Sequence, residues 1–416
     1  MKVLFLCGGI GKRMFPLTED KFLLKFLGKT LLEHQLETAM EAGLRSFIIV
    51  ANPINLTRIK SIAGLYPDAI FEFVVQEKPL GIANALENAR RLLNDELLIV
   101  NPNDVFEGTA YTNLIDGRRK QKATAYITGY KVKSYFPGGY LVVNEKNALT
   151  CIMEKPGEGK EPSDMVNILV HLHTDPEALL RYISQVKTNA DDVYEQAIDG
   201  MCKDRRAIQV VPYNGIWTPI KFPWHVLDVT RYFLDKAEGY VSPSARISLH
   251  AVVEGKVILD DGVRVFEHAV IRGPVYIGRN TIIGNNTLVR AYSHLGADCV
   301  VGFSTEIKES YVGDGTQFHM NYAGDSVIGA HCSFGAGTIT ANWRFDTRNV
   351  RIKVGENLID TGRDKLGAFI GDNCRTGIQV GIMPGVRIGN NAVIYPQVKL
   401  TKDVAADEII NDSFAD

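Results

Sequence analysis

The chain divides into two parts that differ in the spacing of their apolar residues. Up to about residue 238, short apolar runs alternate with segments of helical period, and four of these runs have the character of buried strands: residues 3–7, 47–51, 71–75 and 97–100. Between them, Thr30 and Glu33 have capping-box spacing, residues 82–93 carry an apolar helix face, and residues 223–239 are expected to form a last helix. Strands that alternate with helices predict an α/β domain with a Rossmann-like sheet.

Beyond residue 239 the apolar period becomes six. Eleven apolar residues follow one another at this interval from Ile247 to Ile307, and the register returns from Ile370 to Leu400. Each unit of six supplies a short strand and a turn, and three units close a triangular coil, so the period predicts a parallel β-helix of hexapeptide repeats. Coils built from such repeats resemble left-handed β-helices. The repeat is interrupted at about 308–327 and 341–365, where we expect loops that carry binding residues.

We therefore predict three regions: an α/β domain over 1–238, a left-handed β-helix over 239–402, and a short acidic tail over 403–416 with no motif. The 416 residues carry a net charge of −2 and no long basic run, which argues against binding to nucleic acid or to an anionic membrane surface. Six scattered cysteines without C-x-x-C spacing argue against a disulfide framework or a zinc site and favour the reducing cytoplasm. No apolar stretch reaches the roughly 18 residues of a membrane span.

A glycine-rich loop follows the first predicted strand. Gly8, Gly9 and Gly11 would let backbone N–H groups approach phosphate oxygens, and Lys12 and Arg13 would add charge-assisted contacts. The spacing fits neither the dinucleotide-binding fingerprint nor the P-loop, so the loop alone is a weak signal.

The loop resembles the L-A-x-G-x-G-T-R-M loop of sugar-1-phosphate nucleotidylyltransferases, and further motifs of that family follow in order. Lys21 stands where the family has its signature lysine, and Gln76, followed by Leu80-Gly81, resembles its base-reading segment. Asp104 corresponds to its metal-binding aspartate. The sugar-binding motifs are matched by Glu154-Lys155-Pro156 and Asn167.

The resemblance spans residues 1 to about 238 and implies transfer of a nucleotidyl group from UTP or dTTP to a sugar-1-phosphate, with release of pyrophosphate. It implies that Arg13 and Lys21 hold the triphosphate as catalytic residues and that Asp104 carries Mg²⁺. Pro219 stands where the family usually has a second metal-binding aspartate, and its side chain cannot ligate a metal. The residues implied to bind substrate are Gly8, Gly9, Gly11, Gln76, Gly81, Gly139, Glu154, Lys155 and Asn167.

The two interruptions of the β-helix carry a second set of polar residues. The motif H-x-x-Y-x-G-D begins at His319 and is followed by G-A-G-T-x-x-x-N, which ends at Asn342. Together they resemble the acetyltransferase half of bifunctional N-acetylglucosamine-1-phosphate uridyltransferases, and residues 365–372 resemble the archaeal-type branch of that family.

Moving an acetyl group from acetyl-CoA to the amine of glucosamine-1-phosphate needs a base, and a histidine with a pKa of about 6.5 suits that task. His319 is therefore the candidate base. The resemblance implies that Asn342 orients the amine or the acetyl group, that Lys308 and Tyr322 hold the sugar's phosphate, and that Arg348 stands where relatives carry a lysine. It also implies that acetyl-CoA lies between adjacent β-helices, so that the active form is a homotrimer or a dimer of such trimers.

Three hypotheses follow for the whole chain. The first is a bifunctional enzyme that acetylates glucosamine-1-phosphate and makes UDP-N-acetylglucosamine or a related nucleotide sugar. The second is a nucleotidylyltransferase whose β-helix is only structural or regulatory. The third is an acetyltransferase with a catalytically silent nucleotide-binding domain, which Pro219 favours. The polar motif that begins at His319 argues against the second hypothesis, because a purely structural coil needs no such residues.

Overall fold

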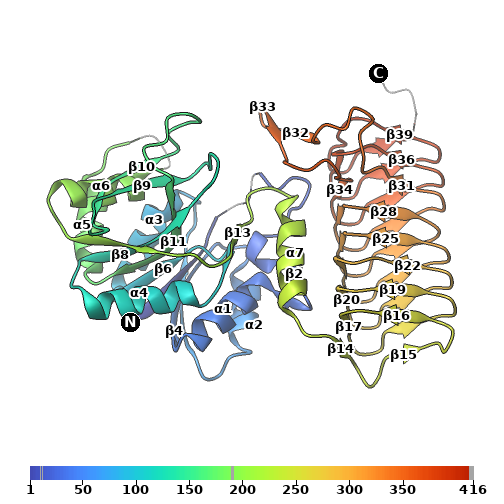
Figure 1. Cartoon of the computed structure of the whole chain (residues 1–416), viewed down its shortest axis with the longest axis horizontal. Coiled ribbons are helices and arrows are strands. Elements are labelled where there is room, and N and C mark those ends of the chain that lie inside the picture. Colours follow the sequence, from blue (N-terminus) through green and yellow to red (C-terminus); the bar gives the residue numbers. More distant parts are fainter. Residues whose placement is uncertain (10, 12, 189–191, 412–416) are drawn as a thin grey trace. The chain divides into compact units, whose positions relative to one another are not determined.

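The computed structural model describes residues 1–9, 11, 13–188 and 192–411. Its contacts divide the chain into two compact units, one made of Met1–Ile10 with Leu31–Trp217 and one made of Gly11–Thr30 with Thr218–Asp416. The first unit is an α/β domain and the second is built around a β-helix (Figure 1). Among the described residues, no helix combines the length and apolar composition that crossing a membrane requires.

The first unit is built on a mixed nine-stranded sheet. The four strands predicted from their apolar runs lie side by side and parallel in the order β6, β1, β4, β5, and the antiparallel strand β11 extends this sheet from β6. The strands are β1 (Lys2–Cys7), β4 (Ser46–Ala51), β5 (Ile70–Val75), β6 (Leu97–Val100), β8 (Ala125–Lys131), β9 (Gly139–Val143), β10 (Leu149–Glu154), β11 (Met165–His173) and β12 (Ile208–Pro212). A separate two-stranded sheet joins β7 (Asp104–Phe106) and β13 (Trp217–Pro219).

In the part of this unit that the structure describes, six α-helices cross between strands or pack on the sheet. They are α1 (Leu31–Glu41), α2 (Leu56–Ala63), α3 (Gly81–Ala89, continued by the 3-10 turn Arg90–Leu92), α4 (Thr109–Lys120), α5 (Pro176–Gln185) and α6 (Val193–Lys203). Buried faces of α3, α5 and α6 form one apolar cluster with the central strands. The helix predicted over 82–93 is thus α3 with its 3-10 extension.

In the second unit, three parallel sheets stack their strands one above another to form a β-helix (Figure 1). The first sheet holds β14 (Tyr240–Val241), β17 (Val257–Leu259), β20 (Val275–Ile277), β23 (Ser293–Leu295), β26 (Tyr311–Val312), β29 (Val327–Ile328), β34 (Phe369–Ile370) and β37 (Arg387–Ile388). The second holds β15 (Arg246–Ile247), β18 (Arg264–Val265), β21 (Ile282–Ile283), β24 (Val300–Val301), β27 (Gln317–Phe318), β30 (Ser333–Phe334), β35 (Arg375–Thr376), β38 (Val393–Ile394) and β40 (Ile409–Ile410). The third holds β16 (Val252–Glu254), β19 (Val270–Arg272), β22 (Leu288–Val289), β25 (Glu306–Lys308), β28 (Tyr322–Gly324), β31 (Ile339–Thr340), β36 (Gly381–Ile382) and β39 (Lys399–Leu400).

The residues that recur every six positions point into this coil. From Leu259 to Ile307 they are almost fully buried, whereas Ile247 in the first turn is 38% exposed. Left-handed backbone at corner residues such as Asn280, Asn286 and Asp298 turns the chain between strands, and asparagine and aspartate tolerate this conformation better than most side chains. Stacked aliphatic side chains therefore form the core of the β-helix.

The first of the two predicted interruptions is not a loop. Strands β26 to β29 continue the coil through residues 311–328 with unbroken parallel pairing. The inward residues follow at intervals of five, six, five and five from Ile307 to Ile328, so three units have lost one corner residue while their strands stay in place. The second interruption is a true insertion, with the antiparallel hairpin β32 (Arg351–Val354) and β33 (Asn357–Asp360).

The boundaries of the compact units differ from the predicted domains at two places. Strand β40 pairs with β38, and Val404 bridges to Ile388, so residues 404–410 continue the β-helix instead of forming a tail. The last predicted helix, α7 (His225–Lys236), and the segment Gly11–Thr30 belong to the unit of the β-helix. That segment contains the 3-10 turn Lys21–Leu23 and the hairpin of β2 (Lys25–Phe26) and β3 (Lys29–Thr30).

Candidate active sites

The glycine-rich loop after β1 lies beside a buried glutamine, Gln76. A Cβ atom on Gly8 would lie 2.2 Å from the Gln76 Oε1 atom, so only glycine leaves room for this amide. Gln76 is buried, and its Nε2 atom donates to the Gly81 carbonyl at 3.1 Å and to Asn84 Oδ1 at 2.9 Å. Gly81 has a left-handed backbone with φ of +82°. Gly8, Gln76 and Gly81 therefore form one fixed group in the first unit.

A second group in the first unit joins three strands. Gly139 in β9 pairs with Glu154 in β10, and a Cβ atom on Gly139 would lie 2.9 Å from Asn167 Oδ1 and 3.1 Å from Glu154 Oε2. Lys155 follows with a left-handed φ of +46°, and its Nζ atom lies 2.6 Å from Glu154 Oε1. The structure thus brings together Gly139, Glu154, Lys155 and Asn167, with a half-exposed cation beside polar groups that can bind hydroxyls.

Asp104 is a nearly buried carboxylate at the start of β7. Its Oδ1 atom accepts from Asn101 Nδ2 at 3.2 Å and its Oδ2 atom from Trp217 Nε1 at 3.1 Å. Among the described residues, no group of three or more His, Cys, Asp or Glu side chains could hold a metal ion. One carboxylate fits a Mg²⁺ ion that takes its other ligands from phosphates and water, which is a usual arrangement for this ion.

Three predicted residues of the nucleotidyl site lie in the other unit. The ideal Cβ position of Gly11 is 3.5 Å from the Lys21 Cε atom, so this lysine lies along the loop backbone. The Arg13 guanidinium lies 5.8 Å from the centre of the Phe222 ring. Gly9 has open space around it in the first unit, and Lys12 lies outside the described residues.

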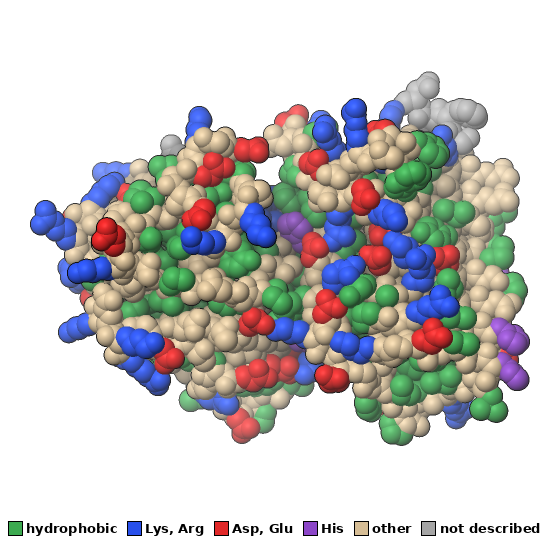
Figure 2. Space-filling model, viewed as in Figure 1, with side chains coloured by type: hydrophobic (Ala, Val, Ile, Leu, Met, Phe, Trp, Pro, Cys, Tyr) green, Lys and Arg blue, Asp and Glu red, His purple; other side chains and the backbone are tan. Residues whose placement is uncertain are grey.

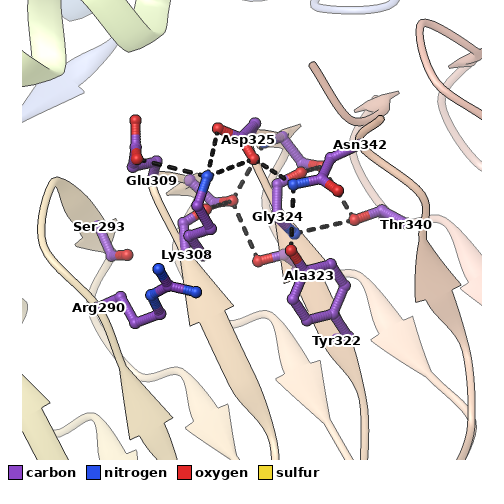
Figure 3. A network of polar contacts seen from close by, with 12 residues as sticks. Arg290, Ser293, Lys308, Glu309, Tyr322, Ala323, Gly324, Asp325, Thr340 and Asn342 are labelled. Atoms are coloured by element: carbon purple, nitrogen blue, oxygen red, sulfur yellow. Dashed lines mark hydrogen bonds and ion pairs between the residues drawn. The ribbon is translucent and has the colours of Figure 1, made fainter. Parts of the chain in front are cut away.

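In the β-helix, Lys308 is the centre of a polar network (Figure 3). Its Nζ atom lies 2.8 Å from both carboxylate oxygens of Asp325 and 3.4 Å from Glu309 Oε1. Asn342 Nδ2 donates to Asp325 Oδ2 at 2.5 Å and to the Tyr322 hydroxyl at 3.1 Å. Burial disfavours the charged form of Lys308, but the hydrogen bonds and charges of the two carboxylates outweigh it and raise its pKa.

Consecutive turns of the coil bring these residues together. Lys308 ends β25, Tyr322 begins β28, and these two strands pair directly, with Asn342 two residues beyond β31 in the next turn. The Lys308 and Asp325 side chains are only 10% and 4% exposed. The predicted residues Lys308, Tyr322 and Asn342 therefore lie in one cluster.

His319 and Arg348 lie outside this network. His319 is exposed at the corner before β28, where its backbone N–H donates to Asn321 Oδ1 at 2.7 Å. It precedes Tyr322, the first residue of β28, by three residues. Arg348 is exposed in the inserted segment. Within the described part of one chain, no hydrogen bond or ion pair joins either side chain to the Lys308 network.

Sequence reasoning gave Asp325 no role of its own, although it closes the motif that begins at His319. In the structure the Asp325 carboxylate balances the positive charge of Lys308 and accepts a hydrogen bond from Asn342. Glu309, directly after Lys308, was also missed, and only the folded corner brings its carboxylate to Lys308. Figure 2 shows basic and acidic side chains interspersed on the displayed face, so an anion on that face meets local clusters of charge rather than a broad field.

Two family models match this chain. The nucleotidyl transferase model matches residues 2–218, and the bacterial transferase hexapeptide model, of six repeats, matches residues 367–402. A crystal structure of UDP-glucose pyrophosphorylase complexed with UDP-glucose has a TM-score of 0.51 at 19% identity, covering 57% of this chain and 99% of that chain. This likeness bears on the fold alone.

Several similar proteins match the chain over nearly its full length, and two of them serve as examples. The bifunctional sugar-1-phosphate nucleotidylyltransferase/acetyltransferase of Sulfurisphaera tokodaii is 34% identical over 98% of this chain and 99% of its own. The bifunctional protein GlmU of Methanococcus maripaludis is 35% identical over 99% of this chain and 97% of its own. The chain belongs to the family of bifunctional sugar-1-phosphate nucleotidylyltransferase/acetyltransferases.

Proposed function

We propose that this chain catalyses two successive transfers in the synthesis of a nucleotide sugar. The β-helix moves the acetyl group of acetyl-CoA to the amine of glucosamine-1-phosphate, and the α/β half couples the product to a uridylyl or thymidylyl group, giving UDP-N-acetylglucosamine or its dTDP counterpart. The single observation that carries the proposal is the network that joins the buried pair Lys308–Asp325 to the half-buried Asn342 and Tyr322 in a chain of this family. A coil that served only as a scaffold would not need a buried charge pair there, because such pairs contribute little net stability.

For acetyl transfer, the amine nitrogen of the sugar attacks the thioester carbonyl carbon, and the carbon–sulfur bond then breaks. His319 accepts the proton that the amine loses and returns it to the departing CoA thiolate. Lys308 and Tyr322 bind the phosphate of the sugar, and Asn342 orients the amine or the acetyl group. Asp325 keeps Lys308 charged and fixes the Asn342 amide.

The exposure of His319 at the corner before β28 supports a further part of the proposal. The site is completed between β-helices of adjacent subunits, so the active form is a homotrimer, or a dimer of such trimers, with acetyl-CoA in the groove between two coils. Arg348, on the inserted segment, is the proposed contact for the substrate's charged groups.

For nucleotidyl transfer, a phosphate oxygen of the sugar attacks the α-phosphorus of UTP or dTTP, and the bond to pyrophosphate breaks. Gln76 pairs with the base. Arg13 and Lys21 bind the triphosphate, together with the backbone N–H groups of the loop glycines Gly8, Gly9 and Gly11. Lys155 binds the sugar phosphate. Glu154 and Asn167 bind sugar hydroxyls. Gly139 leaves room for these two side chains, and the Gly81 carbonyl holds the Gln76 amide. Mg²⁺ held by Asp104 and the phosphates would neutralise charge on the leaving pyrophosphate. We place this chemistry in the reducing cytoplasm.

The two activities are tested with separate variants. His319→Ala should abolish release of CoA thiol from acetyl-CoA and glucosamine-1-phosphate while leaving pyrophosphate release intact, and Lys21→Ala should do the reverse. His250→Ala is the matched control, because His250 is also an exposed histidine at a corner of the β-helix. Acetyl transfer that survives in His319→Ala would refute the assignment of the base.

Pro219 and the single carboxylate at Asp104 favour one second candidate, an acetyltransferase whose α/β half binds nucleotide without turnover. Pyrophosphate release across UTP, dTTP, CTP, GTP and ATP, with N-acetylglucosamine-1-phosphate and with glucose-1-phosphate, separates the two. No release from any pair, together with normal acetyl transfer, would establish this second candidate.

A further inference from the structure

The segment Gly11–Thr30 carries Arg13 and Lys21, yet it belongs to the compact unit of the β-helix. Lys21 lies between Thr18 and Lys25, and both of these flanking residues bind corners of the coil. The Asn390 Nδ2 atom donates to Thr18 Oγ1 at 2.8 Å, and the Lys25 Nζ atom lies 2.6 Å from Asp314 Oδ2. The lysine that the nucleotidyl reaction needs is thus fixed on both sides by the acetyltransferase half.

Asp314 is well placed to act as the anchor for Lys25. Its other oxygen, Oδ1, accepts from the Ala297 backbone N–H at 2.9 Å, so the rigid corner of the coil fixes the carboxylate. Between Lys25 and the hairpin turn, the Phe26 side chain is fully buried, with its ring centre 5.8 Å from that of Tyr311 in β26 and 5.5 Å from that of Phe233 in α7. Charge and apolar packing therefore act on adjacent residues of the hairpin.

His294 in β23 holds the turn of the same hairpin. Its Nε2 atom accepts from the Leu27 backbone N–H at 3.3 Å, and its ring stacks between Tyr276 and Tyr311 at 4.8 Å from each. Burial lowers the pKa of His294 to about 4, so the ring is neutral near pH 7 and Nε2 is available as an acceptor.

The turn itself has a conformation that needs such support. Leu27 has a left-handed φ of +49° and Gly28 one of +82°. A two-residue turn of this kind prefers asparagine, aspartate or glycine, and a leucine there is strained unless its surroundings hold it. A Cβ atom on Gly28 would lie 2.8 Å from the Tyr276 hydroxyl oxygen, so the turn fits closely against the coil.

From these contacts we propose that Asp314 and His294 of the β-helix are positioning residues for nucleotidyl transfer, because they hold the segment that carries Arg13 and Lys21. The proposal rests on the proposed function of these two cations. The acetyltransferase coil then affects the rate of nucleotidyl transfer by positioning these cations. A displacement of about 1 Å at a charged group can lower a rate about 100-fold.

The test uses the full chain with substitutions at the Lys25–Asp314 pair. Asp314→Asn removes the charge that faces Lys25, while the amide oxygen can still accept from Ala297. Lys25→Met removes the cation, and Lys25→Arg keeps it. Asp372→Asn is the matched control, because Asp372 Oδ1 accepts from the Ala330 N–H at 2.7 Å in the same way, and in the described part of the chain Asp372 forms no ion pair with a lysine.

We expect Asp314→Asn and Lys25→Met each to lower kcat of pyrophosphate release about 10- to 100-fold, with the KM for the sugar phosphate within about twofold of wild type. The double variant should be no slower than either single variant, and Lys25→Arg and Asp372→Asn should stay near wild type. CoA release should be unchanged in all of them. A merely structural role would instead lower both activities together.

Amide hydrogen exchange over residues 11–30 gives a readout that does not depend on turnover. We expect faster exchange in Asp314→Asn than in Asp372→Asn within this segment, with no change in peptides from the rest of the coil. If wild type releases no pyrophosphate, the proposed function has failed, and faster exchange together with weaker UTP binding in Asp314→Asn would still support the positioning role. Equal exchange and equal rates in all variants, or parallel loss of both activities, would overturn it.

Discussion

Removing one charge of the Lys308–Asp325 pair should destabilise the β-helix more than removing both. The Nζ atom lies 2.8 Å from each carboxylate oxygen, and the two side chains are 10% and 4% exposed. At that distance and an effective dielectric constant of about 20, the attraction is about 6 kcal/mol before the cost of desolvation. A charge left alone in such a site loses the attraction but keeps that cost.

Loss of one partner of a buried pair typically costs about 3–5 kcal/mol. We expect the lower end for Asp325→Asn, because Glu309 still faces Lys308 at 3.4 Å, and the upper end for Lys308→Met, which leaves Asp325 with hydrogen bonds but no cation beside it. The double variant, with neutral groups at both places, should lose less than either single variant.

The free energy of unfolding is measured by hydrogen exchange at increasing urea, read from peptides that cover residues 300–345, so that the β-helix is followed separately from the α/β unit. Arg272→Met and Glu254→Gln are the control, because this exposed pair, 3.3 Å apart, should contribute under about 1 kcal/mol. Additive losses in the double variant, or a loss below about 1 kcal/mol in Asp325→Asn, would refute the argument.

Three further predictions follow from buried groups. Burial lowers the pKa of His171 and brings that of His173 to about 4. Between about pH 6.5 and 4 only the unfolded chain therefore binds these protons, and the free energy of unfolding should fall as the pH drops through that window. Urea titrations at pH 7, 5.5 and 4.5 would measure this fall, and a free energy of unfolding that does not change with pH would contradict it. Tyr194→Phe removes the hydroxyl that lies 2.8 Å from His171 Nδ1 and 2.9 Å from His173 Nε2 and should cost about 1–3 kcal/mol in the same assay, whereas a stability equal to wild type would show that the hydroxyl is dispensable. Gly8→Ala should displace the Gln76 amide and raise the KM for the nucleoside triphosphate about tenfold or more; an unchanged KM would mean that this amide does not contact the base.

The period of the apolar residues was enough to predict both folds, because burial in a coil or in a parallel sheet constrains each inward position directly. It failed between residues 308 and 327, where three repeats are one residue short. A missing corner residue interrupts the six-residue period of the sequence, yet the strands on either side of it keep their parallel pairing. The prediction of an acidic tail from residue 403 was wrong for a related reason. The apolar pair Ile409–Ile410 forms one more short strand of the coil.

The candidate sites were predicted only as far as motifs mark them. Glycines such as Gly8 and Gly139 were found through family motifs, and their physical reason, the room they leave for Gln76 and Asn167, is visible only in the structure. The sequence also indicated no link between Lys25 and Asp314, which are 289 residues apart. Contacts of that range depend on how the segment Gly11–Thr30 packs on the coil, and no local pattern encodes it.

The most direct test of the central claim is to incubate the purified chain with glucosamine-1-phosphate, acetyl-CoA, Mg²⁺ and either UTP or dTTP, and to identify the products by mass spectrometry. We predict a nucleoside-diphosphate N-acetylglucosamine, which His319→Ala should fail to make unless N-acetylglucosamine-1-phosphate is supplied. Accumulation of N-acetylglucosamine-1-phosphate without any nucleotide sugar would contradict the account of the α/β half, and the absence of acetylated product would contradict the account of the β-helix.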